Sequence, residues 1–290
     1  MITKIPDRDQ MEIARQAKQL RALLLIGDET PIGNDLPAMV QKLGIILLEY
    51  PIPRVGSNSF CAIFCRTRVD DRELQFLGVN TWDYYDRQLF AIAHELYHYL
   101  NHDQPHISRG PIKDNPVEQK ADWFAAELLL PLEILKAQIL EEFGKVDISQ
   151  LPPLTFLRFI ARLHCTWRLP YKAIVNRLYE ANAVDERAYQ ALYAIDERDE
   201  NETYYRIGKT TSPEVFRLLN TQTRCRGTES KNLECCLRNY EDGIISEEEL
   251  CSGLELFDRS PDDFGISFLD DGSDDEEDDA DESGGSGNEG

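Results

Sequence analysis

The decisive stretch of the sequence is Gln88-Leu89-Phe90-Ala91-Ile92-Ala93-His94-Glu95-Leu96-Tyr97-His98-Tyr99-Leu100. Its helix-forming residues, its apolar face and the absence of Pro and Gly predict an α-helix. His94 and His98 are four residues apart, so both imidazoles lie on one helix face and can reach one metal ion. Glu95 lies beside the first histidine and can reach a water on the metal. The H-E-x-x-H pattern therefore predicts a hydrolytic zinc (Zn²⁺) centre with Glu95 as the general base. The alternative is a core helix that carries two buried histidines.

A catalytic zinc ion that keeps one position for water needs a third protein ligand. A second predicted helix, 117–130, offers Glu118, twenty positions after His98. We expect Glu118 to be that ligand, with Glu127 and Asp122 as rivals. Asp122 follows Glu118 by four residues, shares its face, and can accept a hydrogen bond from the free ring nitrogen of a ligating histidine. For all three carboxylates, the alternative is an ordinary helix with a solvated face.

These two segments resemble the ImmA/IrrE family of bacterial and phage metallopeptidases. The resemblance joins 90–98 with the pattern Glu118-x-x-Ala121-Asp122-x-Phe124-Ala125-x-x-Leu128-Leu129-x-Pro131, and it covers about residues 10–180. It implies that zinc is bound by His94, His98 and Glu118, with Glu95 as the base. It also implies a protein substrate, a helix-turn-helix transcriptional repressor, whose cleavage relieves repression of stress-response or mobile-element genes.

The chain departs from the family pattern at two positions. Tyr97 stands where the family commonly has Gly, and Asp122 stands where it usually has Asn. Neither change removes a ligand, although Tyr97 would narrow the cleft. Peptide hydrolysis also needs a donor that stabilises the oxyanion, and the sequence leaves His102, His164, Tyr171 and several arginines as candidates.

The segments around the predicted helix 88–100 indicate an α+β fold of the zincin-like peptidase type, with a small sheet. Residues 10–26 and 35–43 are expected to be helices, and 45–50, 60–66 and 73–80 to be strands. A strand at 74–80 could pair with an extended substrate if it lies at the edge of the sheet. The alternative is an internal strand without a free edge.

A mainly helical region follows the peptidase motifs. Residues 154–192 are expected to be helical, and within them 157–163 and 170–182 resemble a helix-turn-helix pair. Residues 148–179 contain no Asp or Glu but include Arg158, Arg162, Arg168, Lys172 and Arg177. This basic island is either a DNA-binding surface or a unit used for packing or substrate docking, and we favour the second. We predict a metallopeptidase domain at 1–145, a helical domain at 146–260, and a disordered acidic tail at 261–290.

Charge and composition limit the function. From Asp262 onward lie thirteen acidic residues and no basic one, and without them the net charge of −22 becomes −9. The acidic body argues against direct nucleic-acid binding. No signal-like start, no membrane-length apolar run and no C-x-x-C pair among seven cysteines predict a cytoplasmic protein without a membrane partner. The oligomeric state is not evident.

Two further expectations complete the sequence analysis. Ser246 with Glu249 three residues later predicts a capping box that opens a short helix ending at Leu256. An alternative function is that of a transcription regulator or protein-binding module that uses the basic helical unit, with a structural or vestigial zinc site.

Overall fold

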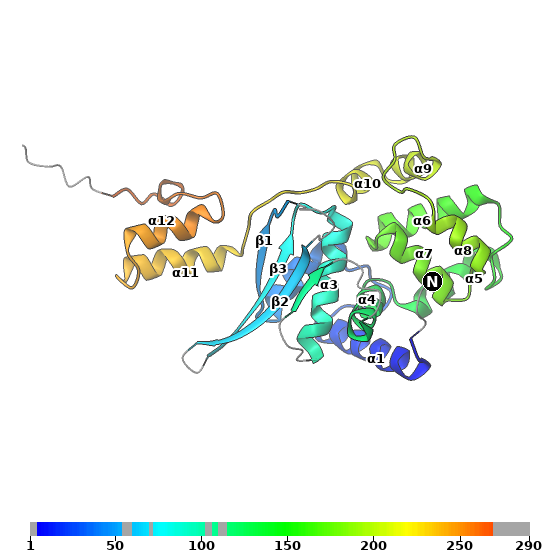
Figure 1. Ribbon diagram of the computed structural model, residues 1–290, viewed down its shortest axis with the longest axis horizontal. Helices are drawn as coiled ribbons and strands as arrows, with labels where there is room; N and C mark the ends of the chain where they lie inside the picture. Colours follow the sequence, from blue (N-terminus) through cyan, green and yellow to red (C-terminus); the bar gives the residue numbers. More distant parts are fainter. Residues whose placement is uncertain (1–4, 54–59, 70–71, 102–105, 110–114, 269–290) are drawn as a thin grey trace, which may run out of the picture. The chain divides into compact units, whose positions relative to one another are not determined.

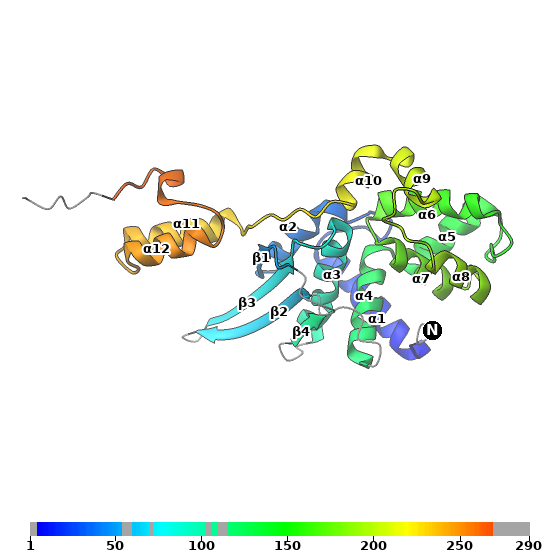
Figure 2. The same ribbon diagram turned by 45° about the horizontal axis from the view of Figure 1, so that its top comes forward.

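The computed structural model describes residues 5–53, 60–69, 72–101, 106–109 and 115–268, with the backbone alone at 106–109. The chain forms two compact units, 1–235 and 236–290, which are described separately. Helices and strands are labelled in Figure 1, and Figure 2 shows them from a second direction.

Twelve α-helices and four strands are present in the described residues. The helices are α1 (Asp7–Leu23), α2 (Leu36–Lys42), α3 (Tyr85–Asn101), α4 (Pro116–Leu129), α5 (Leu132–Phe143), α6 (Pro153–Trp167), α7 (Tyr171–Glu180), α8 (Glu186–Tyr193), α9 (Thr203–Thr211), α10 (Pro213–Leu219), α11 (Ser230–Glu241) and α12 (Glu247–Glu255). The strands are β1 (Ile46–Tyr50), β2 (Phe60–Val69), β3 (Arg72–Asn80) and β4 (His106–Arg109). The 3-10 turns are η1 (Gly33–Asp35) and η2 (Pro261–Phe264). The predicted α+β class and the three predicted strands are confirmed.

The sheet has the order β1-β3-β2-β4. β3 runs parallel to β1, with Ile46 opposite Phe76, and antiparallel to β2, with Phe64 opposite Leu77. β2 also pairs antiparallel with β4. The prediction that 74–80 forms an edge strand is therefore wrong, because β3 has a hydrogen-bonded neighbour on each side.

The helix α3 packs on β2 and β3 and lies against α4, which in turn contacts α1. Its residues Leu89, Ile92 and Leu96 are buried and belong to the same core as Phe64 and Leu77 of the sheet. Their spacing of three and four residues gives α3 one apolar face. The contact with the sheet therefore fixes the orientation of α3, and the other faces of the helix can carry functional side chains.

The helices after residue 146 are built on the same core as the peptidase motifs. α6 packs against α7 and α9, and α7 packs against α8. Phe156, Ile160 and Trp167 of α6 lie in one buried cluster with Leu96 of α3 and Phe124 of α4. The structure accordingly divides at 235/236, whereas we predict boundaries at 145/146 and 260/261.

The basic island does not form one exposed surface. Arg177 is fully buried and forms ion pairs with Glu127 and Glu180. Lys172 donates to the carbonyl of Ile195 at 2.6 Å, and Arg162 forms an ion pair with Glu142. These contacts account for the charges of Arg177, Lys172 and Arg162, three of the five basic residues of the island.

The C-terminal unit contains the second half of α11 and all of α12. Ser246 Oγ accepts from the Glu249 amide at 3.2 Å and Glu249 Oε2 accepts from the Ser246 amide at 2.8 Å, which confirms the predicted capping box. Leu250 and Leu254 are fully buried. Residues 261–264 form η2 rather than disordered chain, and the predicted acidic tail from 269 lies outside the described residues. Within the described part of the chain, no helix combines the length and apolarity that crossing a bilayer requires.

Candidate metal centre

Two histidines and one glutamate meet where α3 and α4 pack together. His94 Nε2 lies 3.3 Å from His98 Nε2 and 3.3 Å from Glu118 Oε2. His98 Nε2 lies 3.5 Å from Glu118 Oε1. One ligand atom from each residue lies within 4.8 Å of the others, and all three residues are buried. Two imidazole nitrogens and one carboxylate oxygen are a donor set that zinc takes in catalytic sites, so these residues could hold such an ion.

The helix contact that brings these three residues together follows from local sequence. Asn115 caps α4 by accepting from the Val117 amide at 3.0 Å, and Pro116 occupies the first turn. This cap places Glu118 in the first turn of the helix. Ala93 of α3 and Ala121 of α4 are fully buried, and small side chains at a helix contact permit a close approach. α4 can therefore present Glu118 directly to the histidine face of α3.

Asp122 orients one of the imidazoles. Its Oδ1 lies 2.8 Å from His94 Nδ1, although the Asp122 side chain is 55% exposed. A proton held on Nδ1 by this carboxylate leaves Nε2 as the nitrogen that faces His98 and Glu118. The predicted contact of Asp122 with His94 is present in the structure, and the metal-ligating role of His94 stays a prediction.

The cluster is strongly negative around His94. Burial is the largest influence on the pKa of His94 and lowers it, but it is outweighed by hydrogen bonds to Asp122 and Glu118 and by the charges of Asp122 and Glu95. Together these interactions raise the pKa to about 10. A site that holds a proton this firmly also attracts a divalent cation, which would take the position of the proton.

Glu95 is fully buried on α3 beside these residues. Burial and the charge of Glu95 together raise the pKa of the Cys65 thiol on β2. The same carboxylate also raises the pKa of His94. Glu95 directly follows His94 in sequence, and a general base for a water at the cluster would be needed close to this position.

The rival ligand Glu127 has a different role. It forms an ion pair with the buried Arg177 and accepts from the Leu132 amide at 3.3 Å. Among the described residues, only His94, His98 and Glu118 form a metal-ligand cluster. Glu127 thus holds α4 to α7 instead of facing the histidines.

The predicted oxyanion donors do not lie in the cluster. His164 is fully buried and contacts Asp86 and Tyr204, and the Tyr171 hydroxyl donates to the Leu192 carbonyl at 2.9 Å. Both side chains are therefore committed elsewhere. His102 lies outside the described residues. Tyr97, which we expected to narrow the cleft, is buried and packs edge-on against His98 with ring centroids 5.6 Å apart.

Sequence reasoning missed a buried polar network at the start of α3. Asp86 Oδ2 lies 3.1 Å from His164 Nε2 and accepts from Arg198 at 2.7 Å, while His164 Nδ1 lies 2.9 Å from the Tyr204 hydroxyl. Burial, the largest influence, raises the pKa of Asp86, but Arg198 and His164 outweigh it and lower the pKa to about 2. A histidine among the apolar residues Ile160, Leu163 and Trp167 of α6 was the one signal of this network in the sequence.

Comparison with known proteins identifies part of the chain. Residues 65–179 match the model of a peptidase M78 family, described as the IrrE N-terminal-like domain. This match contains α3 and α4 with all three clustered residues, and it agrees with the resemblance to ImmA/IrrE metallopeptidases drawn from the two motifs. Searches of the curated proteins and of the solved structures found no match.

Proposed function

We propose that this chain, whose residues 65–179 belong to the IrrE N-terminal-like peptidase family, is a zinc-dependent, site-specific endopeptidase. The observation that carries the proposal is the buried cluster of His94, His98 and Glu118 beside Glu95. Membership in a peptidase family accounts for the reaction class, and the donor set accounts for the metal.

The metal would supply two things at this position. Bound zinc lowers the pKa of water towards neutrality and polarises a peptide carbonyl. His94, His98 and Glu118 would hold the ion, and Asp122 would keep the Nδ1 proton of His94 in place through its 2.8 Å contact. Asp122 thereby also keeps Nε2 directed at the ion.

Glu95 would act first as the general base and then as the general acid of the reaction. Its carboxylate accepts a proton from the attacking water and then returns that proton to the leaving amine. Because Glu95 is fully buried, bulk water competes little for this transfer. A carboxylate is needed here, because an amide of the same size cannot accept the proton.

The proposed substrate is a helix-turn-helix transcriptional repressor, and cleavage would derepress stress-response or mobile-element genes. The resemblance to ImmA/IrrE peptidases supports this substrate class. Burial of all three clustered residues favours a few well-fitted cleavage sites over general digestion. Seven free cysteines favour a reducing compartment, so we propose the cytoplasm.

The competing proposal, a DNA-binding or protein-binding regulator with a structural or vestigial zinc site, has weaker support. It depended on the basic island, in which Arg177 is buried with Glu127 and Glu180 and is not available to a partner. Glu95 is also retained beside the ligands, although a purely structural zinc site has no use for a base.

A direct test incubates the purified full-length chain with zinc and the helix-turn-helix protein encoded beside its gene. The proposal predicts one discrete cut, which mass spectrometry of the fragments locates. Chelator-treated enzyme is the control, and it should leave the repressor intact. An uncut repressor with zinc-loaded enzyme, or equal cutting with and without metal, would overturn the proposal.

A further inference from the structure

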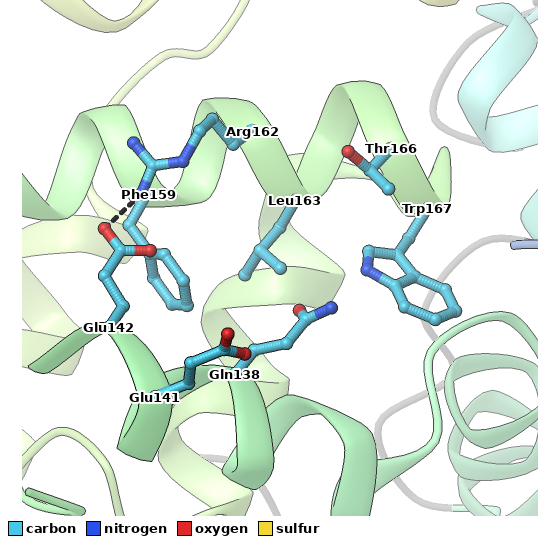
Figure 3. Close-up of a pocket in the computed structure, with 8 residues that line it drawn as sticks. All are labelled: Gln138, Glu141, Glu142, Phe159, Arg162, Leu163, Thr166 and Trp167. Carbon is cyan, nitrogen blue, oxygen red and sulfur yellow. Dashed lines mark hydrogen bonds and ion pairs between the residues drawn. The ribbon is translucent and has the colours of Figure 1, made fainter. Parts of the chain in front are cut away.

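A groove separate from the metal centre lies between α5 and α6. Figure 3 shows its lining, in which α5 contributes Gln138, Glu141 and Glu142 and α6 contributes Arg162, Leu163 and Trp167 among others. The groove encloses about 490 Å³, which is the size of a small-ligand or peptide subsite. None of its lining residues belongs to the histidine cluster or is used in the proposed reaction.

The indole of Trp167 directs an unused donor into this groove. Trp167 is 2% exposed, and its Nε1 is buried without a hydrogen-bond partner among the described residues. In Figure 3 the indole nitrogen faces the interior of the groove, on the side of Gln138. Buried N–H groups are nearly always paired, because an unpaired one loses its hydrogen bond to water. The missing acceptor is therefore expected from a ligand.

Gln138 supplies the complementary groups. Its carboxamide forms no hydrogen bond within the described part of the chain, and Figure 3 shows it lying across the groove between Leu163 and Trp167. A carboxamide both donates and accepts, and the indole donates. Together these groups match the carbonyl and amide of a peptide backbone, while Leu163 and Phe159 form an apolar wall for a neighbouring side chain.

The charged residues of the groove indicate which charge a bound peptide should carry. The Arg162 guanidinium lies 5.8 Å from the Phe159 ring centroid and is neutralised by its ion pair with Glu142. Glu141 is exposed and has no ion pair within the described residues. The groove therefore keeps one uncompensated negative charge, which a basic side chain would balance.

We infer that the groove between α5 and α6 is a docking site for a segment of the protein substrate that carries a basic side chain next to an apolar one. This inference builds on the proposed peptidase function. The peptide carbonyl accepts from the buried Trp167 Nε1 after the Gln138 side chain, which lies beside the indole, has moved aside. The apolar side chain of the peptide packs on Leu163, and its basic side chain faces Glu141. Docking outside the catalytic cluster would select one protein for cleavage without changing the chemistry.

The test follows the Trp167 indole signal by NMR in the zinc-loaded full-length chain with ¹⁵N-labelled tryptophan. Three indole signals are expected, from Trp82, Trp123 and Trp167, and Trp167→Phe assigns the third. The probes are the capped peptide Ala-Leu-Arg-Ala-Leu and the same peptide with Glu in place of Arg. We expect the Arg peptide to shift the Trp167 signal saturably and the Glu peptide to leave it unchanged.

Matched variants on α5 test the charge contact. Glu141→Gln should raise the Kd of the Arg peptide roughly two- to five-fold, as for an exposed ion pair. Glu133→Gln, on the same helix with an 82% exposed side chain outside the groove, should leave the Kd unchanged. An unmoved Trp167 signal, equal binding of both peptides, or equal Kd values for Glu141→Gln and wild type would overturn the docking site.

The failure of the docking site and the failure of the proposed function give different results. Repressor cleavage without any peptide-induced shift of Trp167 would overturn the docking site alone. A saturable shift with no repressor cleavage would overturn the proposed function and leave a peptide-binding groove.

Discussion

Binding of zinc should release a proton from His94, so the metal affinity should rise with pH. The pKa of His94 is raised to about 10 because Asp122, Glu118 and Glu95 outweigh the effect of burial. At pH 7.5 a group with that pKa is protonated in a ratio of roughly 300 to 1. Zinc needs the neutral imidazole, so the apparent affinity should increase about tenfold for each pH unit between 6.5 and 8.5.

Calorimetric titration with zinc in two buffers of different ionisation enthalpy measures this proton release. We expect the release of about one proton per bound zinc ion at pH 7.5. Asp122→Asn removes a charge that raises the His94 pKa, so this variant should release fewer protons. The same variant should bind zinc about 10- to 100-fold more weakly, because the imidazole loses its orienting partner.

A pH-independent zinc affinity, or heats that do not depend on the buffer, would refute this description of the site. Stability gives an independent check with a defined sign. A pKa raised from 6.5 to about 10 stabilises the metal-free fold fully below about pH 6.5, and this stabilisation is lost as pH rises through 10.

Glu118→Ala should lose bound metal, whereas Glu127→Ala should keep it, and metal analysis measures this difference. Glu127→Ala should also lower the free energy of unfolding by about 3 kcal/mol in denaturant unfolding, because Arg177 loses a buried partner. Asp86→Asn should destabilise the fold by about 2 kcal/mol at pH 7, and wild type should lose that amount as pH falls from about 4 to 2, because the Asp86 pKa is lowered to about 2. Gly208→Ala should destabilise by about 1 to 3 kcal/mol because the added Cβ meets the Phe216 ring, while Gly253→Ala, with open space around it, should not.

Specific results would contradict these predictions. Full metal content in Glu118→Ala would exclude it as a ligand. An Asp86→Asn variant with wild-type stability from pH 2 to 7 would mean that the buried network contributes nothing to the fold. Equal unfolding curves for wild type and Gly208→Ala would contradict the close packing of α9 on α10.

The helices α3 and α4 were predictable because the sequence patterns that indicate them are local. Helical spacing places His94 and His98 on one face of α3, and the four-residue spacing of Glu118 and Asp122 places both carboxylates on one face of α4. Alternation of apolar residues likewise identified β1, β2 and β3. Such patterns depend on neighbours within a few residues, which the sequence displays directly.

Long-range pairing could not be predicted in the same way. The order of strands decides whether β3 is internal, and pairing partners come from distant parts of the chain. The charge of Arg177 is cancelled by Glu127, fifty residues away, so a basic run in the sequence did not become a basic surface. The network around Asp86 joins residues from three separate segments, and the sequence shows only its lone histidine, His164.

The most direct test of the central claim compares zinc content and repressor cleavage in wild type and in Glu95→Gln. Gln has nearly the same size as Glu but cannot accept a proton, so the variant should bind zinc as wild type does and lose cleavage by at least a hundredfold. His94, His98 and Glu118 remain intact in this variant. Loss of zinc from Glu95→Gln, or cleavage at the wild-type rate, would contradict the assignment of Glu95 as the base of a metal-dependent peptidase.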